Sequence, residues 1–344
     1  MNPALKNSLL FGIVAAMIVY SGVTQSWNTA LLILNMGLIS AIMALGVNLQ
    51  WGFAGLFNVG IMGFVALGGL AAVLMGMPPT PGAWSAGGWN ILGGLLLAVA
   101  AIVVVVVLMK RMNAGWMRNL VVLAVLVGGF FAFRAIFDAG VAEVEAINPA
   151  GTGYLGGLGI SQGLWVALAW PMGGLFAAAA AWVIGKTALG LRSDYLAIAT
   201  LGIAEIIIAV LKNEDWLSRG VKNVVGLPRP TPYEIDLQND PAFVEAAAGY
   251  GMDAVTASTL YVKLLYAGLF ALVLIVLLVL AQRALHSPWG RMMRAIRDNE
   301  VAAEAMGKDV TARHLQVFVL GSAVCGIAGA MMTTLDGHLT PGTY

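Results

Sequence analysis

The chain has 344 residues, of which 60% are hydrophobic and only 10% are charged, and its mean hydropathy is +0.88. This composition excludes a water-soluble globular protein and indicates a protein of the lipid bilayer. The net charge of +1 provides no general attraction for nucleic acid, and the single cysteine, Cys325, excludes both a disulfide framework and a CxxC metal site.

Successive apolar runs, each near the length of about 20 residues that crosses the hydrocarbon core, predict about nine transmembrane helices. The predicted spans are residues 8–27, 29–49, 55–76, 91–109, 119–137, 162–185, 195–212, 261–282 and 314–335. Only Gln50, Trp51 and Gly52 separate the second run from the third, so a broken or re-entrant helix is an alternative there. The predicted fold is an all-α polytopic transmembrane bundle, with residues 1–344 forming a single domain.

The positions of the basic residues predict a cytoplasmic N-terminus, because positively charged loops stay on the cytoplasmic side. With that orientation, the inner segments hold twelve of the eighteen Lys and Arg residues: Lys6, Lys110, Arg111, Arg118, Lys186, Arg192, Arg283, Arg291, Arg294, Arg297, Lys308 and Arg313. Two long outer loops follow from this topology, residues 138–161 and residues 213–260. The second loop is rich in proline, and we expect it to fold against the outer face.

The inner segment 283–313 is too polar to span the membrane and is predicted to form one or two short helices that end at Gly307. Apolar residues recur in it near helical spacing, at Met292, Met293, Ile296, Val301, Ala302, Ala305 and Met306. Arg294 and Asp298 are placed to form an i,i+4 ion pair. Such a segment suits docking into a groove of a soluble partner. The alternative is an interfacial helix whose arginines face lipid phosphates.

Two features are candidates for a translocation path. Glu205 is the one acidic residue well inside a predicted span, so it should face the protein interior or a water-filled path; the alternative is a hydrogen bond that locks two helices. Glycines cluster around the second break, among them Gly55 and Gly60, beside Asn48 and Asn58. They favour either a broken helix that lines a cavity or plain small-residue packing.

The sequence contains no pattern that predicts catalysis or metal binding. His286, His314 and His338 are scattered, and no HExxH, P-loop or GxGxxG motif is present. We therefore expect no catalytic residue, no metal site and no ATP site in this chain.

The stretch SPWGRMMRAIRDNEVAAEAMGKDVTARHLQVFVLGSAVCGIAGAMM resembles the cytoplasmic coupling region and the following helix of ABC-transporter permeases for branched-chain amino acids (LivM type). Residues 189–213 and 48–69 are similar to two further segments of that family. The resemblance implies that the ATPase-coupling element consists of Ala302, Ala303, Glu304, Ala305 and Gly307, with Arg294 and Arg297 beside it. It places Tyr195, Thr200 and Glu205 in register with a second family segment, and we include Tyr195 and Thr200 among the candidate path residues with Glu205.

The resemblance implies a subunit that translocates branched-chain amino acids across a bacterial inner membrane after delivery by a periplasmic binding protein. The implied partners are a second, homologous and non-identical permease chain and two cytoplasmic ATPase subunits that bind ATP and Mg. A urea or short-chain amide permease is the alternative within the family, although GVKNVVGLPRP, from Gly220 to Pro230, looks more like the amino acid members. An ion-coupled secondary transporter is the alternative outside it, and it would need more intramembrane charges than Glu205.

Two regions depart from the family pattern. Residues 77–161 carry extra apolar length that does not align, and family members continue beyond the position of Tyr344 with at least one more helix. The resemblance therefore implies a C-terminal helix that is missing here. A small-residue face on the last run is predicted to pack against the partner permease; it consists of Gly321, Ser322, Gly326, Gly329 and Ala330.

Overall fold

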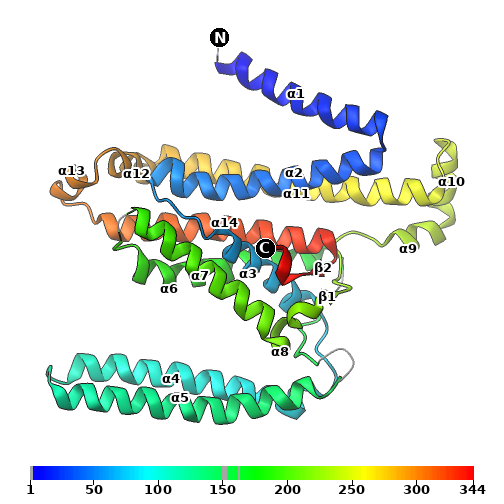
Figure 1. The fold of residues 1–344 in the computed structure, drawn as a ribbon. Helices are drawn as coiled ribbons and strands as arrows, with labels where there is room; N and C mark the ends of the chain where they lie inside the picture. Colours follow the sequence, from blue (N-terminus) through cyan, green and yellow to red (C-terminus); the bar gives the residue numbers. More distant parts are fainter. Residues whose placement is uncertain (1–2, 149–152, 162, 192) are drawn as a thin grey trace.

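Helices form almost all of the regular structure in the computed structural model, which describes residues 3–148, 153–161, 163–191 and 193–344 (Figure 1). The apolar helices are α1 (Pro3–Thr24), α2 (Trp27–Asn48), α3 (Ile61–Gly76), α4 (Trp89–Arg111), α5 (Trp116–Glu145), α6 (Ala169–Ala188), α7 (Ser193–Asn213), α11 (Ala254–His286) and α14 (Val310–Asp336). Each predicted apolar run overlaps one of these helices, but the third run, 55–76, begins before α3 in residues 55–60, which are not helical, and the sixth, 162–185, begins before α6. The all-α polytopic fold class is therefore confirmed.

The remaining elements are short. They are η1 (Leu49–Phe53), η2 (Trp84–Gly88), η3 (Gly163–Leu168), α8 (Asp215–Ser218), η4 (Gly220–Lys222), β1 (Val224–Val225), α9 (Glu234–Asn239), α10 (Pro241–Gly249), α12 (Pro288–Asp298), α13 (Glu300–Ala305), β2 (His338–Leu339) and η5 (Pro341–Thr343). Of these, η1 and η2 are π-helical, while η3, η4 and η5 are 3-10 turns.

Seven helical segments within the described residues are long and apolar enough to cross a membrane, and they contain α2, α4, α5, α6, α7, α11 and α14. The apolar part of α1, Ser8–Thr24, and helix α3 are shorter. Helix α3 has 16 residues and is enclosed by protein along most of its length. At 1.5 Å per residue it is about 24 Å long, less than the roughly 30 Å of hydrocarbon. The number of spans and the side of the N-terminus remain predictions.

Helix α14 lies at the centre of the bundle and packs most extensively on α6, α3 and α2. Its small residues allow this packing, because a Cβ at Gly329 would collide with the backbone of Val65 in α3, and one at Gly326 would collide with Gly173 in α6. The small-residue face of α14 is thus buried inside this chain. The prediction that it meets a partner permease is wrong: small residues mark a close helix approach but do not say which helix approaches.

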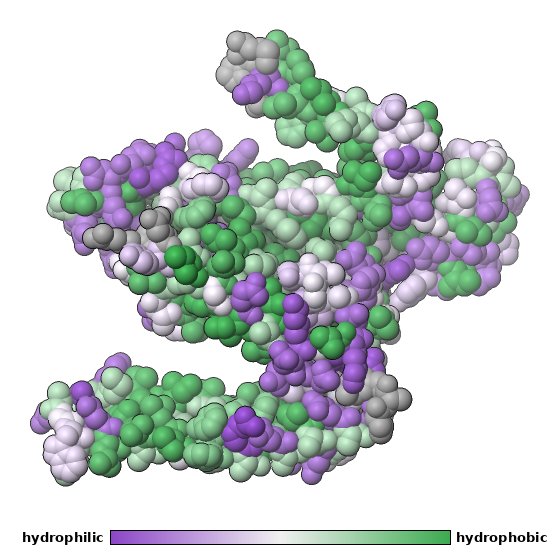
Figure 2. All heavy atoms as spheres, in the orientation of Figure 1, coloured by the Kyte–Doolittle hydropathy of each residue, from purple (hydrophilic) through white to green (hydrophobic). Residues whose placement is uncertain are grey.

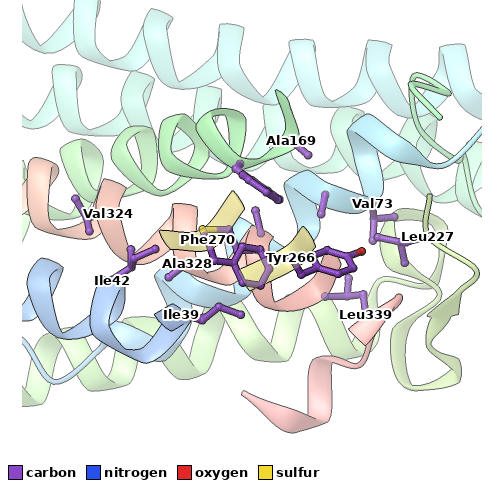
Figure 3. Packing of buried hydrophobic residues seen from close by; sticks show 14 of the residues in the cluster. Ile39, Ile42, Val73, Ala169, Leu227, Tyr266, Phe270, Val324, Ala328 and Leu339 are labelled. Atoms are coloured by element: carbon purple, nitrogen blue, oxygen red, sulfur yellow. The ribbon is translucent and has the colours of Figure 1, made fainter. Parts of the chain in front are cut away.

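The largest buried cluster joins five helices to the segments at the end opposite α12 and α13. Figure 3 shows Ile39 and Ile42 of α2, Tyr266 and Phe270 of α11, and Val324 and Ala328 of α14 converging in one layer. Val73 of α3, Ala169 of α6, Leu339 of β2, and Leu227 in the segment after β1 also belong to the cluster. Phe270 is fully buried, and its ring lies 5.6 Å from that of Trp170. This cluster fixes α11 against the α2–α14 pair.

The segment predicted as a loop over residues 213–260 is folded and packs on the bundle. It contains α8, η4, β1, α9 and α10, and α11 already begins at Ala254. Strand β1 pairs antiparallel with β2, Val224 opposite Leu339, which ties this segment to the chain after α14. The other predicted loop, 138–161, is helical up to Glu145 because α5 continues into it; residues 149–152 lie outside the described part of the chain.

Helices α4 and α5 form a hairpin that stands away from the bundle, as Figures 1 and 2 show. Within the described residues, the hairpin packs on the body of the protein chiefly at one end, where α5 meets α8. Trp216 of α8 is buried there with Ala83, Ile91 and Val144. The rest of the hairpin exposes apolar side chains, which suits contact with lipid tails. This hairpin occupies most of residues 77–161, the region of extra apolar length in the sequence.

Trp216→Ala is expected to loosen the hairpin while the bundle stays folded. The substitution removes an edge-to-face contact with Phe137 and leaves a cavity beside Val144, a loss of about 3–5 kcal/mol. Hydrogen exchange should therefore accelerate in the adjoining ends of α4 and α5 but not in α14. Trp165→Ala, at an exposed position of η3, is the matched control. Equal exchange in both variants would contradict this anchoring role.

Candidate functional site

The helical structure is interrupted between α2 and α3, within an apolar part of the sequence. Helix α2 runs into the π-turn η1, and the backbone then extends from residue 55 to residue 60 before α3 begins. Gly55 has φ +72°, a left-handed conformation that glycine adopts without strain. The amide of Leu56 turns back to the carbonyl of Gln50 at 3.0 Å. We call residues 49–60 the break; the broken-helix alternative is correct here.

A buried hydrogen-bond network fixes the break to α14. Gln50 is 2% exposed, and its Nε2 donates to the Phe318 carbonyl at 2.9 Å and to Ser322 Oγ at 3.0 Å. Its Oε1 accepts from Asn58 Nδ2 at 2.8 Å, and Asn58 Oδ1 accepts from the Gly60 amide at 3.0 Å. Every polar atom of the two amide side chains therefore has a partner, as a position away from water requires.

Helix α7 holds the other side of the break. The Thr200 hydroxyl accepts from the Val59 amide at 3.2 Å and donates to the Ala197 carbonyl at 3.0 Å. Gly60 lies against the Thr200 backbone so closely that a Cβ at Gly60 would overlap the Thr200 carbonyl. Of the predicted path residues, the structure thus brings together Gly55, Asn58, Gly60 and Thr200.

Three predicted path residues lie apart from this network. Asn48 is exposed and lines an open groove of about 480 Å³ with Ala44, Val47, Trp51 and Gly52. Tyr195 and Glu205 are exposed on the side of α7 that faces away from the described helices. Glu205 is thus not enclosed by this chain, so of the two expected environments, the protein interior and a water-filled path, the first is not found. Within the described residues, no hydrogen bond locks it to a second helix. A role in a path stays a prediction.

The segment between α11 and α14 contains two helices with different roles. Met293 and Ile296 of α12 are buried in one cluster with Ala54 and Leu56 of the break. The predicted apolar stripe therefore packs on the chain's own bundle at Met293 and Ile296, and this part of it is not free to dock. Helical spacing identifies an apolar face, but it does not say whether that face meets the chain's own bundle or a partner.

Helix α13 presents the exposed part of the stripe. Val301 and Met306 are 76% and 80% exposed, and Ala302, Glu304 and Ala305 are exposed beside them, whereas Ala303 faces the bundle. Asn299 caps the start of α13 by accepting from the Ala302 amide at 2.9 Å. Gly307 ends the helical turn with φ +76°, as predicted. Helix α13 is thus an exposed apolar knob at one end of the molecule (Figure 1).

The arginines of α12 bond differently from the predicted pattern. Arg294 donates to the Leu285 carbonyl at 3.4 Å, while Asp298 pairs with Arg297 at 3.0 Å, so the expected Arg294–Asp298 pair does not form. Arg297 also donates from Nη1 to the Gly52 carbonyl at 2.7 Å. This bond joins a predicted coupling residue to the break that holds the predicted path residues. Arg192, which the sequence predicts on the inner side, lies outside the described part of the chain.

A small cavity of about 120 Å³ lies where the break meets the segment 283–313. It is lined by Gly55, Leu56, Phe57, Leu189, Leu191, Leu196, Glu300 and His314. Within the described residues, His314 Nε2 is buried and has no hydrogen-bond partner. The break is therefore not tightly filled on this side.

Sequence reasoning missed the central position of Gln50 and the participation of Ser322. A glutamine inside an apolar run was the available signal, because such a side chain needs buried partners. The sequence does not identify its partners, because Phe318 and Ser322 lie 268 and 272 residues later in the chain.

The fold and the site define a helical membrane protein with a polar broken helix at its centre and an amphipathic helix pair at one end. The family model described as "Branched-chain amino acid transport system / permease component" matches residues 29–343. The chain belongs to this permease family.

Two curated relatives are each described as "High-affinity branched-chain amino acid transport system permease protein LivM", from Escherichia coli K12 and Salmonella typhimurium LT2. Each is 32% identical over 190 residues, which cover 53% of this chain and 42% of the relative. A "Probable branched-chain amino acid transport permease protein LivM" of Methanocaldococcus jannaschii is 25% identical over 218 residues, 63% of this chain and 53% of the relative. The chain thus spans about half the length of these relatives. No solved structure matches it.

Proposed function

We propose that this chain is a membrane-spanning permease subunit of an ATP-binding-cassette importer that carries branched-chain amino acids. In this proposal a periplasmic binding protein delivers the substrate, a second permease chain completes the translocation path, and two cytoplasmic ATPase subunits bind ATP and Mg. The complex lies in a bacterial inner membrane. The chain itself contributes no ATP site and performs no catalysis.

One observation carries the proposal: an exposed apolar knob, α13, is joined through α12 to a broken helix inside the bundle. Val301 and Met306 are exposed beside Ala302 and Ala305, which suits insertion into a groove of a soluble protein. Residues of α12 pack against the break, so a partner bound at α13 has mechanical access to the membrane interior. An ion-driven carrier has no need of such a knob.

The substrate class rests on family membership and on the relatives, which are described as branched-chain amino acid transport permeases. Uptake of labelled leucine into vesicles that contain the full complex is expected to need ATP and to survive an ionophore that collapses ion gradients. Labelled urea is the competing substrate. Uptake of leucine that follows an ion gradient without ATP would contradict the proposal. ATP-driven uptake of urea, without uptake of leucine, would mean that the substrate is urea and not a branched-chain amino acid.

Val301→Asp combined with Met306→Asp is expected to release the ATPase subunits. A carboxylate in the apolar contact must be desolvated without a partner, which should weaken retention at least about tenfold. Co-purification from detergent-solubilised membranes measures retention. Val221→Asp, a change at a residue 72% exposed on the segment after α8, is the matched control. Equal retention by both variants would show that α13 is not the docking element.

A further inference from the structure

Arg297 takes the place of a backbone donor where α2 ends. In a continued helix, the Gly52 carbonyl would accept from an amide one turn later. Here the amides of Gly55 and Leu56 donate to the carbonyls of Trp51 and Gln50 instead. The Gly52 carbonyl accepts from Nη1 of Arg297, which lies 245 residues away in the sequence. A guanidinium at a helix C-terminus also meets the negative end of the helix dipole.

The guanidinium is held in this geometry from two sides. Its Nε and Nη2 donate to one carboxylate oxygen of Asp298 at 3.2 and 3.0 Å. Its Cγ packs over Gly55, 3.1 Å from where a Cβ would stand. The neighbouring Arg291 and Arg294 instead bond the carbonyls of His286 and Leu285, within their own segment. Among these three arginines, Arg297 alone reaches the break.

The bond from Arg297 lies close to the network that holds the break. Gly52 lies two residues after Gln50, whose amide holds Asn58 and the α14 backbone. On the side facing Glu300, the cavity of about 120 Å³ leaves space beside Gly55, Leu56 and Phe57. A displacement of α12 can therefore move the break without forcing atoms into a filled core.

We infer that Arg297 is a positioning residue that transmits movement of the docking segment to the broken helix, through its hydrogen bond to the Gly52 carbonyl. The inference rests on the proposed function, because it takes ATPase docking at α13 as the source of movement. It assigns different tasks to residues of one segment: α13 binds the partner and Arg297 transmits its motion.

The test uses the complete complex in proteoliposomes, with Arg297→Ala and Arg297→Lys compared with Arg291→Ala. Arg297→Ala is expected to keep the ATPase subunits bound and to hydrolyse ATP within about twofold of the wild type, while leucine uptake per ATP falls about tenfold, the loss typical of one charge-assisted hydrogen bond. Lysine should restore part of the coupling, since it offers one point charge in place of a fork. Arg291→Ala should couple normally.

A second measurement follows the break itself. Phe57→Cys can be labelled by a thiol reagent, because the native Cys325 is buried. ATP is expected to change the labelling rate when Arg297 is present and to leave it unchanged in Arg297→Ala. Unchanged uptake per ATP in Arg297→Ala would overturn the inference, and so would equal defects in Arg291→Ala or loss of the ATPases from Arg297→Ala. If the wild-type chain retains no ATPase, the proposed function itself fails.

Discussion

Gln50→Leu is expected to abolish transport and to destabilise the bundle. Leucine fills a similar volume, but it leaves the Asn58 amide and the Ser322 hydroxyl without their present partners in a site that is closed to water. Buried unsatisfied polar groups cost about 1–3 kcal/mol each, so we expect a loss of about 2–4 kcal/mol. The break also loses its attachment to α14, and uptake should fall more than about tenfold.

Thermal unfolding in detergent and leucine uptake measure the two effects separately. The matched control is Gln238→Leu, because the Gln238 amide also donates to a serine hydroxyl, Ser258 Oγ at 3.0 Å, in a partly buried position far from the break. This control should lose about 1 kcal/mol of stability and keep its uptake. If Gln50→Leu behaves like the control, the network does not organise the break.

The positions of the helices could be predicted because the bilayer imposes a simple requirement. Each span needs about 20 apolar residues, and such runs stand out in a chain with so few charges. The break was also visible, since Gln50, Asn58 and several glycines interrupt an apolar region. These signals are local in the sequence, so they can be recognised without knowledge of the tertiary structure.

The partners of each side chain could not be predicted in the same way. The bond from Arg297 to Gly52 and the bonds from Gln50 to α14 join residues more than 240 positions apart. Small residues on α14 indicate a close approach, and the approaching helices proved to be α3 and α6 of the same chain. The apolar stripe of residues 292–306 likewise divides between the bundle and the surface, which periodicity alone cannot resolve.

Three glycines, one on each helix, meet where α14 crosses α3 and α6. A Cβ at Gly326 of α14 would meet the carbonyl of Gly173 in α6 and the Ala177 Cβ at 2.5 Å, and the Gly326 carbonyl itself lies against Gly68 of α3. These neighbours are mostly backbone atoms, which cannot rotate away as a flexible side chain can. A larger residue must therefore push whole helices apart.

Gly326→Leu is accordingly expected to prevent assembly of the bundle, at a cost of at least about 3 kcal/mol. The protein should still insert into the membrane, since leucine is more apolar than glycine. In detergent it should elute mainly as aggregate, and any monodisperse fraction should unfold at a lower temperature than the wild type. Gly268→Leu in α11 is the matched control, because no atom lies within 4 Å of a Cβ built there. Both changes raise helix propensity by a similar amount of about 1 kcal/mol, so that effect cancels. A monodisperse and equally stable Gly326→Leu protein would mean that α14 is not clasped between α3 and α6 in the membrane.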